Sequence, residues 1–474
     1  MDITDEQVRQ IVRRVIRNVL ADPGKPAAVA GAPRGEWGVF NDMNDAVEAA
    51  HGAFAKYGSF GIQDRKRFID AVRHMMLEHK EEFARMAVEQ TGMGRVEHKI
   101  AKNANAAIHS PGVEWLEPRS WSGRNGLALD EFAPWGVIGN IMPSTHPAAA
   151  MVNNIIIQIA GGNTIAFNPH PAAKRLSALI VRLANRVLVE AGAPEDLVTC
   201  VADPTLETAE ILFSHPKTRL LSVTGGPGLV AAAMKHPKPV VAAGPGNPPV
   251  LIDETADLAL AAREITESAA FDNNILCIAE KEIFVVESVF SGFCRAFEAA
   301  GNVPLIPAQM DALAAAALVK DGTHWTIGRD HVGRNAAVLG KTLGLALSDR
   351  IPLLFGETGR DHPWVLAEQM TPCIPVVRVR DFEDGLAACL TAEHGFEHTS
   401  SVFTKDMHRA TAFARRMNTD VVVINGGTLR GNGGDSGEGT FSHTIASPTG
   451  QGICTPRDFV RRRRIMTAGA LRFV

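Results

Sequence analysis

From Glu36 onward, the hydrophobic positions of the chain alternate between two patterns. Short apolar runs predict buried strands, and longer stretches with apolar residues three to four positions apart predict helices. The runs that predict strands are 136–142, 164–167, 197–201, 220–223, 240–243, 250–252, 283–286, 374–379, 401–403 and 421–424. The stretches that predict helices are 46–56, 64–91, 172–191, 205–213, 256–270, 382–390 and 407–417. Because strands that alternate with helices are typical of βαβ units, we predict an α/β fold with two mostly parallel sheets, divided near residues 244–249.

Residues 1–20 follow a different pattern. Their apolar side chains recur at helical spacing on one face and four arginines occupy the other, which predicts an amphipathic helix. Residues 21–35 are rich in Pro, Gly and Ala, the composition of a flexible linker. The charges interleaved in the helix argue against a signal peptide. A helix attached in this way suits docking into a groove on another protein, and a first helix packed on its own domain is the alternative.

Composition narrows the class of protein. The 474 residues are enough for about three domains. A formal net charge of −4 argues against nucleic-acid binding, and no apolar run is long enough to span a membrane. The six cysteines form no CxxC pair, so we expect neither a disulfide framework nor a metal site. One of the six remains available as a nucleophile.

Three unusual turns follow predicted strands. Residues 143–147 read Pro-Ser-Thr-His-Pro, residues 168–171 read Asn-Pro-His-Pro, and residues 224–228 read Thr-Gly-Gly-Pro-Gly. In parallel sheets, ligands bind at the carboxyl ends of the strands. The glycine turn opens a helix whose backbone N–H groups could bind a phosphate by donating hydrogen bonds to it, and an ordinary strand-to-helix turn is the alternative.

Five motifs lie in order along the chain at residues 143–147, 222–228, 246–249, 271–281 and 444–450. Together they resemble the aldehyde dehydrogenase family, and more closely its CoA-acylating propionaldehyde and acetaldehyde dehydrogenases of bacterial microcompartments. The resemblance implies a Rossmann-like cofactor domain, an α/β catalytic domain and a small oligomerisation arm. The implied bounds are 36–115 with 135–243 for the cofactor domain, 244–439 for the catalytic domain, and 116–134 with 440–474 for the arm.

By this resemblance Cys277, in the sequence Phe-Asp-Asn-Asn-Ile-Leu-Cys, is the catalytic nucleophile. A thiolate adds readily to an aldehyde carbonyl, and loss of hydride to NAD+ then leaves a thioester. The intervening alkoxide needs hydrogen-bond donors, for which relatives use the cysteine's own N–H and an Asn side chain. Here His146 stands at the Asn position, and it either donates from its imidazole or only packs the turn. His398 matches a histidine proposed to assist the thiol steps, with a purely structural role as the alternative.

The resemblance also assigns the contacts to NAD. Glu368 matches the glutamate that hydrogen-bonds the nicotinamide ribose. The other implied cofactor-binding residues are Phe167, Asn168, Pro169, Thr224, Gly225, Gly226, Gly228 and Gly244. Asn168 replaces a lysine of other family members, so we expect the adenosine contacts to differ. We hypothesise that the adenine of CoA uses the same cleft after NADH leaves.

One departure from the family pattern bears on the second half of the reaction. Hydrolytic members carry a glutamate that activates water on the thioester, and alignment on residues 246–248 puts Ala242 at that position. A CoA thiol is already partly ionised near neutral pH and needs less assistance than water. We therefore predict acyl transfer to CoA. A hydrolytic aldehyde dehydrogenase that releases the free acid is the alternative, and an inert recruiting scaffold is the alternative of another class.

These features predict an enzyme that converts a short aldehyde (propionaldehyde in preference), NAD+ and CoA into acyl-CoA and NADH. The helix at residues 1–20 resembles encapsulation peptides, which predicts binding to a shell or core protein and a place in a microcompartment lumen within the bacterial cytoplasm. We expect a homodimer or homotetramer, with the arginine run 461–464 beside the interface or simply solvated. The glycine-rich residues 426–439 are expected to form an irregular loop near the substrate mouth.

Overall fold

The computed structural model of the chain describes residues 35–322 and 324–471. The predicted helix at residues 1–20, and the predicted linker apart from Gly35, lie outside the described residues. None of the described helices combines the length and the apolar character that a membrane crossing requires.

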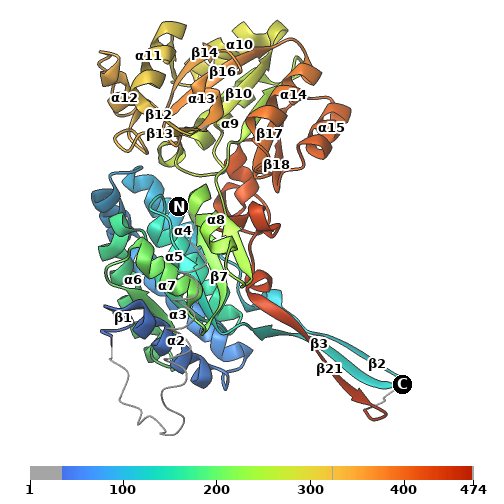
Figure 1. Cartoon of the computed structure of the whole chain (residues 1–474). Coiled ribbons are helices and arrows are strands. Elements are labelled where there is room, and N and C mark those ends of the chain that lie inside the picture. The colour runs from blue at the N-terminus through green and yellow to red at the C-terminus, as the bar shows by residue number, and fades with distance from the viewer. Residues whose placement is uncertain (1–34, 323, 472–474) are drawn as a thin grey trace, which may run out of the picture. The chain divides into compact units, whose positions relative to one another are not determined.

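Six parallel strands form the first sheet, in the order β1-β6-β5-β4-β7-β8. Figure 1 labels β1 and β7 of this sheet together with helices of the same part of the chain. Their bounds are β1 Val39–Phe40, β4 Val137–Ile141, β5 Thr164–Asn168, β6 Val198–Val201, β7 Thr218–Thr224 and β8 Val240–Ala243. The helices of this part are α2 Met43–Tyr57, α3 Ile62–Thr91, α4 Val96–His109, α5 Pro147–Ala160, α6 Lys174–Glu190, α7 Leu206–Ser214 and α8 Pro227–Met234.

Helices pack on both faces of this sheet, because successive side chains of a strand point to opposite faces. In β5, Ile165 and Phe167 belong to a core cluster with α3, α5 and α6. Ala166, which lies between them, belongs to a second cluster with α2, α7 and α8. The sheet is therefore apolar on both sides, as the continuous apolar runs in the sequence predict.

Seven parallel strands form the second sheet, in the order β11-β14-β16-β10-β9-β17-β18. Their bounds are β9 Pro249–Ile252, β10 Glu282–Val286, β11 Val303–Leu305, β14 Leu354–Thr358, β16 Cys373–Val379, β17 Thr399–Phe403 and β18 Val421–Ile424. The helices of this part are α9 Leu258–Ala270, α10 Glu287–Ala299, α11 Pro307–Ala317, α12 Ala336–Thr342, α13 Pro363–Leu366, α14 Phe382–Ala392 and α15 Met407–Met417. The predicted α/β fold with two parallel sheets is thereby confirmed.

Three smaller sheets complete the described fold. The strands β2 Arg119–Gly123, β3 Gly126–Pro134 and β21 Val460–Ala468 form an antiparallel sheet, in which β3 is central. The strands β12 Leu318–Asp321, β13 His324–Ile327 and β15 Ala367–Glu368 form the next, and β19 Ile445–Ala446 pairs with β20 Gly452–Ile453. Between the two large sheets, the chain passes from the end of β8 to the start of β9 through residues 244–248.

Candidate active site

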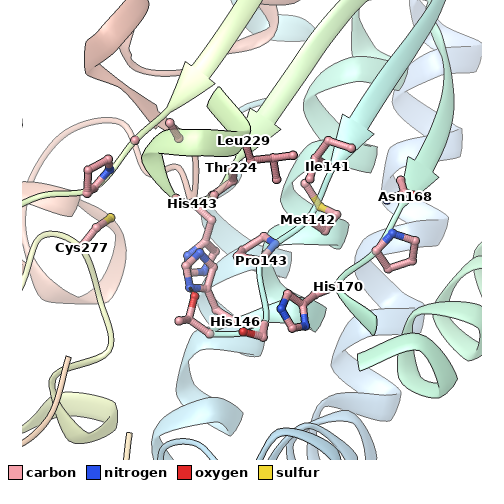
Figure 2. A pocket seen from close by; sticks show the side chains of 18 of the residues that line it. Ile141, Met142, Pro143, His146, Asn168, His170, Thr224, Leu229, Cys277 and His443 are labelled. Atoms are coloured by element: carbon pink, nitrogen blue, oxygen red, sulfur yellow. Dashed lines mark hydrogen bonds between the residues drawn. The ribbon is translucent and has the colours of Figure 1, made fainter. Parts of the chain in front are cut away.

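A cavity of about 520 Å³ lies at the carboxyl ends of the first sheet's strands, and the second sheet's part of the chain closes it (Figure 2). All three turns that the sequence singles out contribute to its wall, after β4, β5 and β7. The residues that line it and that the site uses below are Thr145, His146, Asn168, Pro169, Thr224, Gly225, Gly226, Gly244, Cys277, Glu368 and His443. The sequence-predicted nucleophile and most of the predicted cofactor residues therefore share one cavity.

Cys277 follows a backbone segment of unusual conformation. Three consecutive residues, Asp272, Asn273 and Asn274, have φ values of 50°, 56° and 66°. This left-handed region is disfavoured for most side chains, and Asp and Asn tolerate it best. Side-chain hydrogen bonds fix the segment: Asn273 donates to the Gly333 carbonyl at 2.8 Å, and Asn274 donates to the Glu280 carbonyl at 2.9 Å. The rare run Asp-Asn-Asn thus supports the turn that presents the cysteine.

Lys281 binds the same segment from inside the protein. The side chain is fully buried, and its ammonium donates to the Asn274 carbonyl at 2.8 Å, the Asn274 Oδ1 at 2.6 Å and the Leu276 carbonyl at 3.1 Å. Burial lowers the pKa of Lys281 to about 8, and the neighbouring Glu368 and Cys277 oppose that fall. Lys281 belongs to the 271–281 motif, but the sequence alone gives it no role.

The Cys277 thiol is half-buried, and its surroundings hold it in the protonated form. Burial raises the pKa of Cys277 to about 12, Glu368 adds to the rise, and Lys281 opposes it. The other five cysteines of the chain do not line the cavity. A reactive thiolate at this position therefore requires removal of a proton during the reaction.

His146 and His443 form a pair of stacked imidazoles in the cavity wall. Their ring centroids are 5.2 Å apart with an angle of 28° between the planes. The Nδ1 of His146 lies 2.9 Å from Thr145 Oγ1. Figure 2 shows the two rings on the side of the cavity formed by the first sheet's turns, with Cys277 on the other side. The sequence predicts His146 at this site but gives no indication of His443, although it directly precedes the 444–450 motif.

A buried cluster of three charges lies beneath these rings. Lys99 Nζ contacts Asp272 Oδ2 at 3.0 Å and donates to the Thr145 carbonyl at 2.9 Å. Lys102 forms a second ion pair with the same carboxylate oxygen. Lys99 thus connects the turn that carries His146 with the segment that precedes Cys277. These lysines belong to α4, which is not among the predicted helices, and no sequence motif marks them as part of the site.

Glu368 contributes a carboxylate to the cavity. Its Oε1 accepts a hydrogen bond from the Gly246 N–H at 3.3 Å, and burial raises the pKa of Glu368 while Lys281 opposes the rise. Among the described residues that line the cavity, Glu368 is the sole carboxylate. Ala242 is buried in β8, and its N–H donates to Thr449 Oγ1 at 2.9 Å, so no acid occupies the position of the hydrolytic glutamate.

His398 does not line the cavity but lies directly behind its wall. A Cβ on Gly246 would be 3.1 Å from the His398 ring and 2.6 Å from the Cys277 carbonyl oxygen, so glycine is needed for this close approach. The Nδ1 of His398 lies 2.8 Å from Thr399 Oγ1, and burial together with Lys281 lowers the pKa of His398 to about 4. The imidazole is therefore neutral at physiological pH and adjacent to the nucleophile's backbone.

The predicted cofactor residues divide into two groups. Asn168, Pro169, Thr224, Gly225, Gly226, Gly244 and Glu368 line the cavity, whereas Phe167 and Gly228 do not. Phe167 points into the core cluster beside α3, and Gly228 lies inside α8. The amide of Asn168 is engaged with the start of α7, where Thr208 Oγ1 donates to Asn168 Oδ1 at 2.6 Å. The glycine-rich residues 426–439 are not among the residues that line the cavity, and their expected place near the substrate mouth stays a prediction.

The cavity has features that suit a dinucleotide. Space is open where a Cβ of Gly226 would lie, at the start of α8, so a phosphate could approach the backbone there. Glu368 supplies an acceptor for ribose hydroxyls nearer the cysteine. In the described part of the chain, no group of three or more His, Cys, Asp or Glu side chains is arranged to hold a metal ion.

Known proteins share this sequence and fold. A sequence model of the aldehyde dehydrogenase family matches residues 37–437. The chain is 42% identical over 475 aligned residues to the acetylating acetaldehyde dehydrogenase EutE of Salmonella typhimurium, and the alignment covers 100% of each. The crystal structure of Rhodopseudomonas palustris propionaldehyde dehydrogenase with bound CoA and an acylated cysteine has a TM-score of 0.89 and 39% identity, and covers 92% of this chain and 99% of that one.

A third relative comes from a microcompartment. The propionaldehyde dehydrogenase of the Clostridium phytofermentans fucose-utilisation bacterial microcompartment has a TM-score of 0.89 and 38% identity, and covers 93% of this chain and 100% of that one. The family match spans most of the sequence, and the similarity to these relatives extends over nearly the whole chain. The chain therefore belongs to the aldehyde dehydrogenase family.

Proposed function

We propose that this chain is a CoA-acylating aldehyde dehydrogenase, which oxidises a short aldehyde with NAD+ and transfers the acyl group to CoA. One observation carries the proposal: Cys277 faces a cavity in which Glu368 is the sole carboxylate among the described lining residues. A thioester formed on Cys277 has no base in the position that hydrolytic members use to activate water, where this chain has Ala242. The acetylating and CoA-bound relatives support the same conclusion.

The residues of the site take complementary roles in this proposal. Cys277 adds to the carbonyl carbon as the thiolate, after its proton has passed to water in the cavity, and its own N–H together with His146 donates to the oxygen that becomes negative. Glu368 binds the nicotinamide ribose, and the turn at Thr224, Gly225 and Gly226 binds phosphate at the start of α8. When NAD+ is bound, its nicotinamide ring would accept the hydride that the former aldehyde carbon loses. His398 is neutral and adjacent to Cys277, which suits a role in proton transfer when the thiol of CoA attacks.

A requirement for CoA distinguishes the two enzymatic alternatives. We expect NADH formation from propanal to stop after about one equivalent per active site without CoA and to continue when CoA is added. The measurement is NADH absorbance at 340 nm over the first turnovers and at steady state. Continued turnover without CoA, with free propionate as product, would establish the hydrolytic alternative instead.

Cys277→Ala tests the nucleophile. We expect this variant to lose both the first-turnover NADH and the steady-state rate, because no other cysteine lines the cavity. Cys294→Ala is a suitable control, since Cys294 is also half-buried but lies on α10, away from the cavity. NADH formation by Cys277→Ala would contradict the assignment, and equal loss in the Cys294→Ala control would indicate a general effect on folding.

We also propose that the enzyme prefers propionaldehyde among short aldehydes. Relatives at nearly the same identity are named for acetaldehyde and for propionaldehyde, so the choice rests on kinetics. A series from acetaldehyde to butanal, with CoA saturating, should give the highest kcat/KM with propanal. A higher value with acetaldehyde would keep the enzyme class and change the substrate.

We also propose that residues 1–20 attach the enzyme to a microcompartment shell or core protein. Support comes from the amphipathic pattern of this segment and from the relative named for a fucose-utilisation microcompartment. Deletion of residues 1–20 should leave kcat and KM unchanged and abolish co-sedimentation with purified shells. A deletion that loses activity would instead favour a helix packed on its own domain.

A further inference from the structure

His443 has no role in the function proposed so far, yet its side chain lines the cavity. It lies just before β19, and its ring contacts two neighbouring rings, one stacked and one edge-on. The His146 ring is stacked against it, with the ring centroids 5.2 Å apart. The Phe441 ring lies edge-on, with the centroids 5.1 Å apart and an angle of 83° between the ring planes. The backbone N–H of His443 donates to Asn153 Oδ1 at 3.2 Å. His443 is therefore fixed both through its backbone and through its ring.

The same stack restricts His146. Its ring is held by His443 on one side and by the contact between Nδ1 and Thr145 Oγ1 at 2.9 Å. When the threonine hydroxyl donates to Nδ1, the single proton of a neutral imidazole is on Nε2. The ring then has one N–H donor free of the Thr145 contact, in a residue that lines the cavity opposite Cys277.

The charges around the pair favour neutral rings. Lys99 and Lys102 of α4 and Asp272 of the nucleophile segment are the charged groups that act on them, two cations against one anion. Burial, Lys102, His443 and Lys99 lower the pKa of His146 well below its usual value. Burial and Lys102 lower the pKa of His443 to about 3. Both imidazoles are thus uncharged over the working range of pH, and a neutral N–H can donate a hydrogen bond to the alkoxide without transferring its proton to it.

We propose that His443 is a positioning residue, which holds the neutral His146 ring so that its Nε2–H donates to the aldehyde oxygen while Cys277 adds to the carbonyl carbon. The inference rests on the proposed function and goes beyond it by assigning a residue outside the sequence motifs. Donors that are preorganised before the charge develops stabilise it most, because they need not reorient during the reaction. In this chain a stacked pair of imidazoles takes the place of the asparagine amide.

The proposal predicts a particular pattern among variants rather than a simple loss. Removal of one oxyanion donor costs about 10²–10³-fold in rate, so His146→Ala should slow the first-turnover NADH burst by about 100-fold. His443→Ala should slow it by about 10-fold or more through the loss of the stack. His443→Phe keeps an aromatic ring in the stack and should remain within about threefold of wild type. In the double variant, His146→Ala with His443→Ala, no further loss is expected, because the two residues act as a unit.

A second comparison uses a variant in which an asparagine amide replaces the His146 imidazole. His146→Asn introduces a donor that does not depend on stacking, so we expect it to retain activity and to become insensitive to His443→Ala. Thr145→Val, which removes the hydroxyl that fixes the His146 tautomer, should slow the burst in the wild-type background and not in His146→Asn. Each variant is measured as the full chain with propanal and NAD+ in stopped flow without CoA, with its melting temperature recorded. If His443→Ala fails to fold, His443→Leu, which keeps side-chain volume but removes the ring, takes its place in both the wild-type and the His146→Asn background.

Three results would overturn the role of His443. They are equal loss in His443→Phe and His443→Ala, additive losses in the double variant, and an undiminished effect of His443→Ala in the His146→Asn background. Alkylation of Cys277 by iodoacetamide should remain within about twofold in all variants, because the thiol itself is untouched. Absence of any burst in the wild type would reject the proposed function itself, whereas a normal wild type with unaffected histidine variants would reject this inference alone.

Discussion

Cys277 lies among charged groups of opposite sign, and their balance sets how readily the thiol loses its proton. Glu368 raises the pKa of the thiol beyond the effect of burial, while the buried ammonium of Lys281 lowers it. With a pKa of about 12, the thiolate fraction rises about tenfold for each pH unit between 7 and 9. The rate of alkylation of the free enzyme should follow the same slope, without the plateau near pH 8.5 that an ordinary thiol shows.

Glu368→Gln tests the electrostatic part of this balance. The substitution removes the negative charge but keeps an oxygen that can accept from the Gly246 N–H. We expect Cys277 to be alkylated about three- to tenfold faster at pH 8, which corresponds to a fall in its pKa of about half to one unit. Mass spectrometry of the Cys277 peptide after timed treatment with iodoacetamide provides the measurement, because it separates this residue from the other cysteines.

The matched control is Glu81→Gln, which removes an exposed carboxylate on α3 that is paired with Arg85. It should leave the alkylation rate of Cys277 unchanged. An unchanged rate in Glu368→Gln as well would show that burial alone keeps the thiol protonated. The same Glu368 variant should also raise the KM for NAD+, since the proposed contact to the ribose is weakened.

At this scale, the sequence identifies residues whose chemistry is tied to a motif. Cys277, His146, Glu368 and the glycine turn were all predicted, and the structure brings them to one cavity. His443, Lys99 and Lys102 were not, because their importance lies in contacts across the fold rather than in local spacing. Lys99 and Asp272 are 173 positions apart in the chain, and no pattern within one segment could join them.

The segment from Phe271 to Lys281 acts as a single structural element that presents the nucleophile. Its three left-handed residues have an unfavourable backbone conformation, which contacts with other elements must offset. Asp272 accepts from the Arg95 N–H at 2.8 Å and pairs with Lys99 and Lys102. A Cβ on Gly94 would lie 2.0 Å from Asp272 Oδ1, so only glycine fits there. The carboxylate is the point at which α4 and the nucleophile segment are joined.

Asp272→Asn separates charge from backbone shape at this junction, because Asn tolerates the left-handed conformation as well as Asp does. Two buried ammonium groups would lose their counter-ion, so we expect the free energy of unfolding to fall by about 3–5 kcal/mol at pH 7. The first-turnover rate should fall as well, since the segment positions Cys277. Denaturant titration gives the first quantity and the NADH burst gives the second.

The pH dependence of that difference provides a check on its sign. Burial opposes ionisation of Asp272, but Lys102 and Lys99 outweigh it and lower its pKa. A carboxyl whose pKa is depressed on folding contributes stability above its unfolded pKa of about 3.9 and loses it as the pH falls. The difference in stability between wild type and Asp272→Asn should therefore begin to shrink below about pH 4 and disappear as the pH falls through the lower pKa that Asp272 has in the folded protein. Asp203→Asn, which breaks the exposed pair with Lys174, should change stability by less than about 1 kcal/mol at any pH.

Among the elements, the predicted strands match strands of the two large sheets, whereas several helices were missed for identifiable reasons. All 14 residues of α5 are buried, including Asn153, Asn154 and Gln158, so no solvent-exposed polar face distinguishes this helix from a buried apolar run. The helix α10 is different, because Phe290, Phe293 and Phe297 follow helical spacing and are buried together, so its sequence does carry a helical signal. Buried helices inside an α/β fold are therefore the elements that hydrophobic periodicity identifies least well.

At the scale of the whole molecule, the sheet of β2, β3 and β21, called the arm sheet below, carries exposed apolar side chains on its outer strands. Both outer strands of the arm sheet, β2 and β21, have one unpaired edge. Large apolar side chains are exposed on them: Trp121 at 49%, Ile465 at 48% and Met466 at 59%. The arginine run is in β21, where Arg463 pairs with Glu131 and Arg464 with Asp130. Part of that run is thus neutralised within the arm, which argues against a free basic patch.

Open strand edges with exposed apolar residues favour pairing with another chain, and the arm is where we predict that two copies of this chain associate. The double substitution Ile465→Asp with Met466→Asp should reduce the mass in solution from that of a dimer or tetramer toward the 50.8 kDa of a single chain. Two carboxylates placed in an apolar interface without partners would weaken association by about 100-fold or more. Light scattering coupled to size-exclusion chromatography measures the mass. The melting temperature of the double variant should stay close to that of the wild type, because the substitutions lie outside the two large sheets.

Met407→Asp is the control, because Met407 is 73% exposed on α15 and its substitution should leave the mass unaltered. A wild type that already elutes as a monomer, or an arm variant with the wild-type mass, would place association on another surface and leave the arm with a role inside the single chain.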